Sequence, residues 1–276
     1  FEWFGGAVNC KYLVAYKGWD DDFDTDNGYS GKVQFGLSVR DPRLADQSQS
    51  NGFESDNCAD GAKVPPYTTA TFSNITFVGP KAAADFQNDK SYITGGDYFP
   101  NNGSGLGKFQ SAMQIRRSSR LNCVNSVATD WPIGLIVDGE KGNTLEQANA
   151  GTLNLKNIYF ANMDVVGTDA NKCYEDKEYD FKTKSVKADS EMSFSHRFFE
   201  KQDGNRYFAD KSQLMLTDGK GVGVPFMPQA GSLLFGAQNF DGLDSWFDQV
   251  TYIGAFNAGD NWLDGWTNFD PQNANY

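Results

Sequence analysis

The chain has 276 residues, a formal net charge of −12 and 39% hydrophobic residues. A negative charge of this size argues against nucleic acid and anionic membrane surfaces as partners. The sequence contains no run of about 18 apolar residues, so it predicts no transmembrane segment. Its length allows a substantial core, and its 29 glycines and 14% aromatic residues suit a turn-rich all-β protein.

Three early segments share one local chemistry, an aromatic residue followed by a carboxylate and soon by Gly or Asn. They read FEWFGG at 1–6, FDTDNG at 23–28 and FESDN at 53–57. Constant chemistry at unequal separations (1 to 23, then 23 to 53) is typical of a solenoid whose loops vary while its strands stack. The stack predicts an aromatic core column of Phe1, Phe23 and Phe53. Beside it, at a spacing of about 4.8 Å, it predicts an acidic column of Glu2, Asp24 and Glu54.

Strand-length runs rich in Val, Ile, Phe and Tyr follow these motifs and recur further along the chain. They occupy residues 8–14, 33–39, 72–78, 121–127 and 153–160. Amphipathic helical stretches are almost absent, and the best one covers residues 145–150. Successive strands without hairpin dipeptides or crossover helices predict an all-β fold, a right-handed parallel β-helix. A β-sandwich is the alternative, because regularly spaced strands with turn signals also suit it.

The chain divides into three regions on this interpretation. Residues 1–163 should form about five rungs, with a Gly- and Asn-rich loop excursion at 81–110. Residues 164–235 are charged and less periodic, which indicates a long irregular insertion or subdomain. Residues 236–276 should form a final rung and a Trp-rich C-terminal cap.

Three asparagines, Asn74, Asn125 and Asn157, fall just before or within the second strand of a predicted rung. Asparagine tolerates a left-handed backbone, and stacked side-chain amides can hydrogen-bond to one another. We therefore expect these residues to form a structural ladder along the coil.

An acidic segment suggests a calcium site. Aspartates at positions 22, 24 and 26 are followed by Asn27 and Gly28, but no Glu stands at the twelfth position, so the segment is not an EF-hand. Alternate positions on a strand face one way, and carboxylates from the next rung could complete a shell of oxygen ligands. The predicted Ca²⁺ ligands are Asp22, Asp24, Asp26, Glu54 and Asp56. The alternative is a hydrated acidic face that keeps the solenoid soluble.

Four cysteines permit three pairings. An even count of cysteines favours disulfides in a chain that we expect to be exported, and no Cys/His cluster indicates a zinc site. Cys10 and Cys123 occupy similar places on the first and fourth predicted rungs, about 14 Å apart and too far to bridge. We therefore expect the bridges Cys10–Cys58 and Cys123–Cys173, with free buried thiols as the alternative.

Residues 1–9, the acidic segment 19–26 and the tail 252–271 carry a resemblance to a known group of proteins. They resemble the secreted or lipid-anchored β-helix proteins of Bacteroidota-type bacteria, for which FEWFGG and GWTNFDP are fairly specific. The resemblance implies a right-handed β-helix, an extracellular or outer-membrane location and no established reaction. Because an uncapped solenoid end exposes strand edges and core, we expect further rungs or a partner to cover the end at Phe1.

Few residues are available for catalysis. His196 is the only histidine and no nucleophile-elbow motif is present, so we assign no catalytic residue. Candidate contacts to a glycan are Trp19, Tyr29, Arg116 and Arg117. We interpret the chain as a non-catalytic, calcium-stabilised surface module that binds a polysaccharide or a surface protein. The alternative is a polysaccharide lyase or glycoside hydrolase, because stacked carboxylates supply pairs at glycosidase separations.

Overall fold

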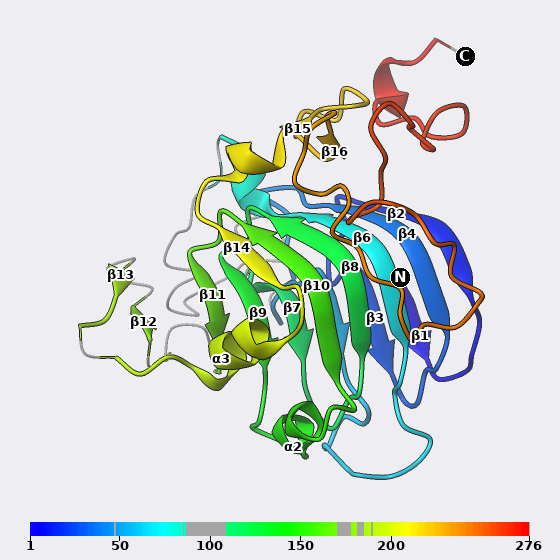
Figure 1. Cartoon of the computed structure of the whole chain (residues 1–276). Helices are drawn as coiled ribbons and strands as arrows, with labels where there is room; N and C mark the ends of the chain where they lie inside the picture. Colours follow the sequence, from blue (N-terminus) through cyan, green and yellow to red (C-terminus); the bar gives the residue numbers. More distant parts are fainter. Residues whose placement is uncertain are drawn as a thin grey trace.

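The computed structural model describes residues 1–46, 48–84, 86, 109–169, 178–180, 185–188 and 190–275. Two six-stranded parallel sheets wind around a common core (Figure 1). Sheet A consists, in spatial order, of β1 (Glu2–Phe4), β3 (Phe23–Asp26), β5 (Phe53–Ser55), β7 (Ser111–Ile115), β9 (Ile133–Val137) and β11 (Val165–Thr168). Sheet B consists of β2 (Cys10–Tyr16), β4 (Lys32–Val39), β6 (Thr71–Val78), β8 (Asn122–Thr129), β10 (Asn154–Ala161) and β14 (Arg206–Phe208).

One strand of each sheet makes a rung. From β1 to β10 the strands alternate between the sheets, which gives the five rungs predicted for residues 1–163. The sixth rung consists of β11 in sheet A and β14 in sheet B. In the sequence these two strands are separated by residues 169–205, a longer connection than in the other rungs. The parallel β-helix predicted from the sequence is therefore confirmed.

The remaining elements are short. They are η1 (Pro80–Ala82), α2 (Thr144–Asn149), β12 (Tyr179–Asp180), β13 (Ser185–Val186), α3 (Phe194–Lys201), η4 (Lys211–Leu214), β15 (Leu216–Thr217), β16 (Met227–Pro228) and η5 (Pro271–Asn273). The helix α2 falls where the sequence has its best helical stretch. Most of the predicted loop excursion at 81–110 lies outside the described residues.

The core is built on the predicted aromatic column. Phe23 pairs in register with Phe53, and Phe53 pairs with Met113 of the next rung. All three side chains are fully buried. Phe1 stacks on Phe23 with ring centroids 5.7 Å apart, but it lies on the first rung and is 47% exposed.

A column of left-handed residues bends the strands of sheet B. It consists of Tyr12 (φ 61°), Phe35 (φ 61°), Asn74 (φ 58°), Asn125 (φ 50°) and Asn157 (φ 51°). Asn157 Nδ2 donates to Asn125 Oδ1 at 3.2 Å, whereas Asn74 Oδ1 accepts from Gln34 Nε2 at 3.1 Å. The predicted ladder is thus confirmed between Asn125 and Asn157, and its backbone conformation is confirmed at all three asparagines.

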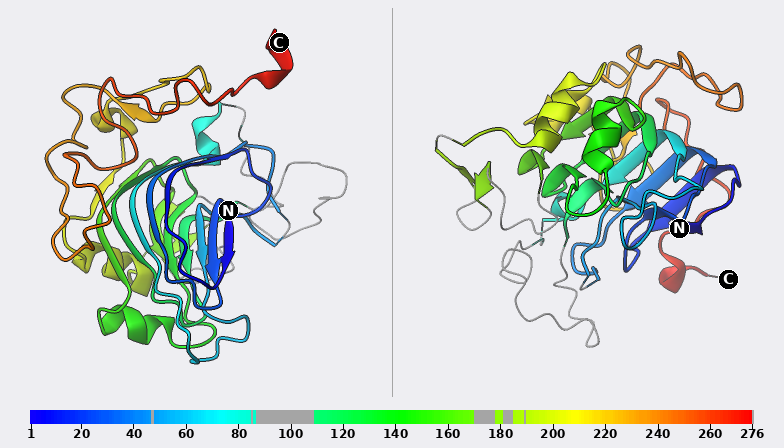
Figure 2. Two further views of the ribbon diagram at one scale, coloured as in Figure 1. Left: turned by 90° about the vertical axis from the view of Figure 1, so that its right-hand side faces the viewer. Right: turned by 90° about the horizontal axis from the view of Figure 1, so that it is seen from below.

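The C-terminal segment covers the outer face of sheet B. In Figures 1 and 2 the orange segment runs across the strands of this sheet on the side away from sheet A. Three side-chain amides donate hydrogen bonds to its backbone: Gln34 to Asp248 O (2.8 Å), Asn74 to Tyr252 O (3.0 Å) and Asn125 to Asn239 O (2.9 Å). Apolar side chains of the segment, including Ile253, Phe256 and Leu263, are buried against this face.

The prediction of a final rung within residues 236–276 is wrong. The described part of this range contains isolated bridges but no strand, and side-chain amides of sheet B bind its backbone at Asp248, Tyr252 and Asn239. The Trp-rich tail also does not close the end of the coil. Trp262 packs edge-on against Tyr12 at 5.4 Å, beside sheet B.

The helix α3 closes the end of the coil instead. Ser193 caps it, with its Oγ accepting from the backbone N–H of His196 at 3.0 Å. Phe199 stacks on Phe160 of the fifth rung with ring centroids 4.5 Å apart. Ser195 Oγ accepts from the backbone N–H of Val137 at 2.9 Å, which ties the helix to β9.

The predicted disulfides are also corrected. Cys10 and Cys58 are free thiols, because Cys10 opens β2 in the first rung whereas Cys58 follows β5 in the third. Cys123 is free and buried; its expected partner, Cys173, lies outside the described residues. Register pairs place Cys10 and Cys123 in one column three rungs apart, as the sequence indicated.

The stacked core predicts that Phe23→Ala destabilises the fold by about 3–5 kcal/mol, because it removes a fully buried ring. Phe4→Ala is the matched control, since Phe4 is 65% exposed, and it should cost less than about 1 kcal/mol. Urea denaturation measures both. Equal losses in the two variants would contradict a core column at Phe23.

The thiols should differ in reactivity. Burial raises the pKa of Cys123 to about 12, so an alkylating reagent should reach it only when the fold opens. Cys10 and Cys58 are only partly buried and should react first. Timed alkylation of the native protein followed by peptide mapping measures this order. Recovery of a Cys10–Cys58 disulfide peptide would contradict it.

Candidate functional site

The strands of sheet A align carboxylates on its outer face. Glu2 pairs in register with Asp24, and Asp24 pairs with Glu54. The predicted acidic column is therefore present, one residue per rung. Asp26 and Asp56 follow two residues later on their rungs and extend the same face.

Two arginines meet these carboxylates. The guanidinium of Arg116 contacts the carboxylate of Glu54 through Nη2 and donates from Nε to Asp56 Oδ1 at 2.8 Å. Arg117 Nη1 donates to Asp56 Oδ2 at 2.7 Å. Both arginines follow β7, and the left-handed backbone of Arg117 (φ 49°) turns the chain here. The predicted glycan contacts Arg116 and Arg117 and the predicted metal ligands Glu54 and Asp56 thus form one ion-pair network.

The paired carboxyl groups on this face hold protons unusually well. Burial raises the pKa of Asp24 to about 7, and the charges of Asp56 and Glu2 add to the effect. Burial also raises the pKa of Glu54 to about 8, since it outweighs the attraction of Arg116. Near neutral pH, this face therefore contains carboxyl groups that can donate as well as accept hydrogen bonds.

The residues do not fit the calcium site predicted from the sequence. Asp22 lies just before β3, where the alternation of the strand does not extend, and its buried carboxylate pairs with Arg40 Nη1 at 2.9 Å. The carboxylates of Glu54 and Asp56 are already paired with the guanidinium groups of Arg116 and Arg117. Only two of the five expected ligands remain, whereas Ca²⁺ takes six to eight oxygens. Across the described residues, no group of three or more His, Cys, Asp or Glu side chains is arranged to hold a metal ion.

The two predicted aromatic contacts lie away from this network. Tyr29 is fully buried, stacks on Trp3 at 5.2 Å and donates from its hydroxyl to Val8 O, so it is a core residue. Trp19 is 40% exposed, and its indole N–H donates to Asp46 Oδ1 at 3.1 Å. Trp19 alone of the two is accessible to a ligand.

A parallel β-helix with a charged outer face defines the structural class. The chain belongs to the family of pectate-lyase-like β-helix domains, whose family model matches residues 1–197. No curated protein and no solved structure matches the chain. In the part of the chain that the structure describes, no helix is long and apolar enough to cross a membrane. The family accounts for the fold and specifies no ligand.

The raised pKa values predict how stability depends on pH. Unfolded carboxyl groups lose their protons near pH 4, whereas Asp24 and Glu54 keep theirs to about pH 7 and 8. The native state therefore binds more protons across this window, and its free energy of unfolding should fall as pH rises from 4 to 8. Each shift corresponds to a loss of at most about 4 kcal/mol, and because the two groups interact, their combined loss is smaller than the sum.

Urea denaturation at each pH measures this contribution as the difference between the native protein and the variant Asp24→Asn/Glu54→Gln. The variant should have the flatter profile. Asp203→Asn is the control, because the Asp203 side chain is 88% exposed. Identical profiles for the native protein and the double variant would contradict the assignment.

Proposed function

We propose that the outer face of sheet A binds a polysaccharide chain without cleaving it. The observation that carries the proposal is the in-register stack of Asp24 and Glu54, with Asp26 and Asp56 beside it. Parallel pairing repeats hydrogen-bonding groups at a rung spacing of about 4.8 Å. A repeated array of this kind suits a ligand that is itself a repeating chain of hydroxyl groups. Membership of the pectate-lyase-like family supports the same class of ligand.

The charge of the face indicates which polysaccharide it prefers. Arg116 and Arg117 are already paired with Glu54 and Asp56, so their charges are not available to a ligand. Glu2 and Asp26 add further carboxylates to this face and would repel the acid groups of a polyuronate. We therefore expect a neutral glycan.

Protonated carboxyl groups give the face donors for such a ligand. Asp24 holds its proton near neutral pH and can donate to a sugar hydroxyl, while its second oxygen accepts. Glu54 also holds a proton, and because its Oε2 already accepts from Arg116, its other oxygen is the one that can donate to the ligand. When pH rises above about 8, both groups ionise and lose their donors. Binding should then weaken.

Glycoside hydrolysis is the second candidate. Two carboxyl groups on adjacent rungs, at least one of them protonated, have the composition of a glycosidase acid and base pair. The raised pKa values of Asp24 and Glu54 favour this alternative over a lyase. In a hydrolase, both carboxyl groups would be catalytic, and the amide variants Asp24→Asn and Glu54→Gln would be inactive.

Affinity gel electrophoresis on xylan, glucan and mannan, with polygalacturonate alongside, tests binding. We expect retention by a neutral polysaccharide and a loss of at least about tenfold in affinity for Asp24→Ala/Glu54→Ala, since each lost hydrogen bond is worth about 1 kcal/mol. The variant Asp24→Asn/Glu54→Gln keeps donors and acceptors, so it should still bind at pH 9, where the native protein does not.

Three outcomes would overturn the proposal. Retention by polygalacturonate alone would contradict the neutral ligand. Unchanged retention of the double alanine variant would place binding elsewhere. Release of reducing ends by the native protein, lost in Asp24→Asn/Glu54→Gln although that variant still binds, would establish hydrolysis instead. Asp203→Asn is the control in each assay.

A further inference from the structure

A pocket of about 580 Å³ opens at the end of the coil. Val166 of β11, Tyr207 of β14 and three residues of α3 (His196, Phe199 and Glu200) line it together with Asn205. Tyr207 pairs in register with Phe160, so it continues a core column beyond the fifth rung. The pocket is thus the part of the sixth rung that α3 does not fill.

The imidazole of His196 is held in one orientation. Its Nδ1 lies 2.7 Å from Oε1 of Glu178, a carboxylate with only 9% of its side chain exposed. The other oxygen, Oε2, accepts from the backbone N–H of Ser193 at 2.9 Å, which fixes the carboxylate in turn. A carboxylate accepts hydrogen bonds, so Nδ1 carries a hydrogen that points at Glu178, and Nε2 faces the pocket.

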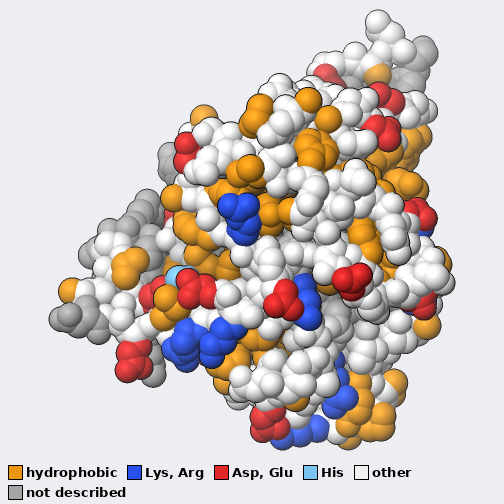
Figure 3. Space-filling model, in the orientation of Figure 1, with side chains coloured by type: hydrophobic (Ala, Val, Ile, Leu, Met, Phe, Trp, Pro, Cys, Tyr) orange, Lys and Arg blue, Asp and Glu red, His pale blue; other side chains and the backbone are white. Residues whose placement is uncertain are grey.

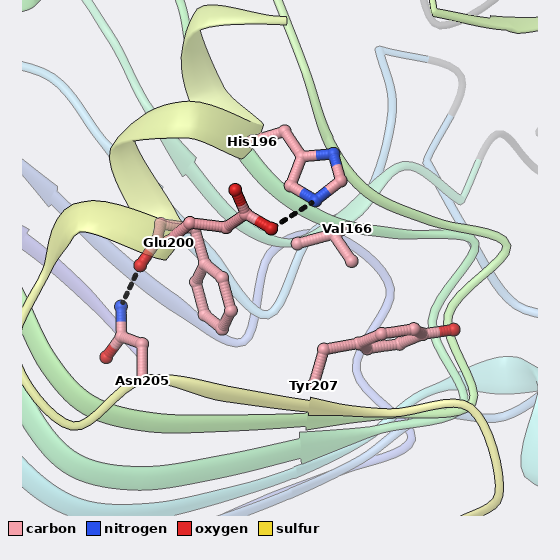
Figure 4. A pocket seen from close by; sticks show the side chains of 6 residues that line it. Val166, His196, Glu200, Asn205 and Tyr207 are labelled. Atoms are coloured by element: carbon pink, nitrogen blue, oxygen red, sulfur yellow. Dashed lines mark hydrogen bonds and ion pairs between the residues drawn. The ribbon is translucent and has the colours of Figure 1, made fainter. Parts of the chain in front are cut away.

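Two polar groups therefore stand side by side in the pocket. Nε2 of His196 lies 3.7 Å from Oε1 of Glu200, a contact that is an ion pair when the imidazole is protonated. In Figure 4 both groups lie on one side of the pocket, and the ring of Tyr207 lies across from them. The imidazole, pale blue in Figure 3, reaches the surface beside acidic side chains.

The other polar side chains of the pocket have structural partners. Asn205 donates to Phe199 O at 3.0 Å and accepts from the backbone N–H of Ile158 at 2.8 Å. The hydroxyl of Tyr207 donates to Met163 O at 3.2 Å. Tyr207, a residue that is 40% exposed, consequently offers the apolar face of its ring.

We propose that this pocket binds a single saccharide unit. One hydroxyl group of the sugar hydrogen-bonds to Nε2 of His196, the adjacent hydroxyl donates to the carboxylate of Glu200, and the C–H face of the ring packs on Tyr207. Paired hydroxyl groups on one edge and an apolar face on the other distinguish a sugar from ligands that offer charge alone. The site is separate from the outer face of sheet A, and it does not depend on the function proposed there.

The single histidine of the chain provides a direct readout. Its imidazole nitrogens give one set of signals in a ¹H–¹⁵N long-range correlation spectrum, which separates Nε2 from Nδ1. The probes are the methyl glycosides of glucose, galactose and mannose. Tetrahydropyran-2-methanol, which has no adjacent hydroxyl groups, is the matched negative probe. Tetramethylammonium and Zn²⁺ test cation and metal binding.

We expect at least one glycoside to shift Nε2 in a saturable manner, with little effect of tetrahydropyran-2-methanol. Glu200→Gln and Tyr207→Leu should each raise the dissociation constant at least about fivefold, which corresponds to a loss of about 1 kcal/mol of binding free energy. Glu146→Gln is the exposed control on α2 and should bind normally, as should Asp24→Ala/Glu54→Ala.

Several results would overturn the proposal: no shift with any glycoside, a shift only with tetramethylammonium or Zn²⁺, or an unchanged dissociation constant in both pocket variants. A loss of glycoside binding in the sheet A variant would assign the signal to the other site. Chemical shifts of the remaining amides show whether each variant is folded.

Discussion

Parallel pairing in strict register is the constraint on which this structure depends. Each residue of sheet A lies directly over its counterpart on the next rung, so side chains at equivalent positions of successive rungs are brought into contact. For Phe23 and Phe53 this stacking forms the core. For Glu2, Asp24 and Glu54 it brings like charges together, and two charges 4.8 Å apart repel by about 3 kcal/mol at an effective dielectric constant near 20.

The fold relieves that repulsion in two ways. Arg116 and Arg117 supply positive charge from the fourth rung to carboxylates of the third. Asp24 and Glu54 retain protons to higher pH than isolated carboxyl groups do. The result is a face that is polar and rich in both donors and acceptors. The outer face of sheet B is covered by the C-terminal segment.

The sequence contained the columns but not their partners. Repetition of an aromatic residue and a carboxylate revealed the stacks of Phe23 with Phe53 and of Asp24 with Glu54, because a repeat fixes which positions are equivalent. The prediction that Asp22 faces the same way as Asp24 was wrong, because β3 begins after Asp22 and the alternation of the strand does not extend to it. Arg116 could be placed on a later rung but not against Asp56, because that contact depends on the register across a long loop.

Contacts between residues outside the repeats could not be predicted from the sequence, because only a repeat shows which positions are equivalent. The pairing of His196 with Glu178 joins residues of an irregular region, where no repeat defines equivalent positions. The expected bridge of Cys10 with Cys58 failed because cysteine spacing alone does not say on which side of a rung each residue lies. Docking of the C-terminal segment through side-chain amides likewise has no periodic signature in the sequence.

The C-terminal segment alters the cooperativity expected of a solenoid. Rungs that touch only their nearest neighbours can fray one at a time from either end. Residues 239–255 instead contact Lys11 of the first rung, Gln34 of the second, Thr76 of the third and Asn125 of the fourth. A single stretch of chain therefore couples four rungs, so that opening any one of them also breaks contacts that hold the segment on the others. The coil should thus behave as one cooperative unit rather than as a linear array.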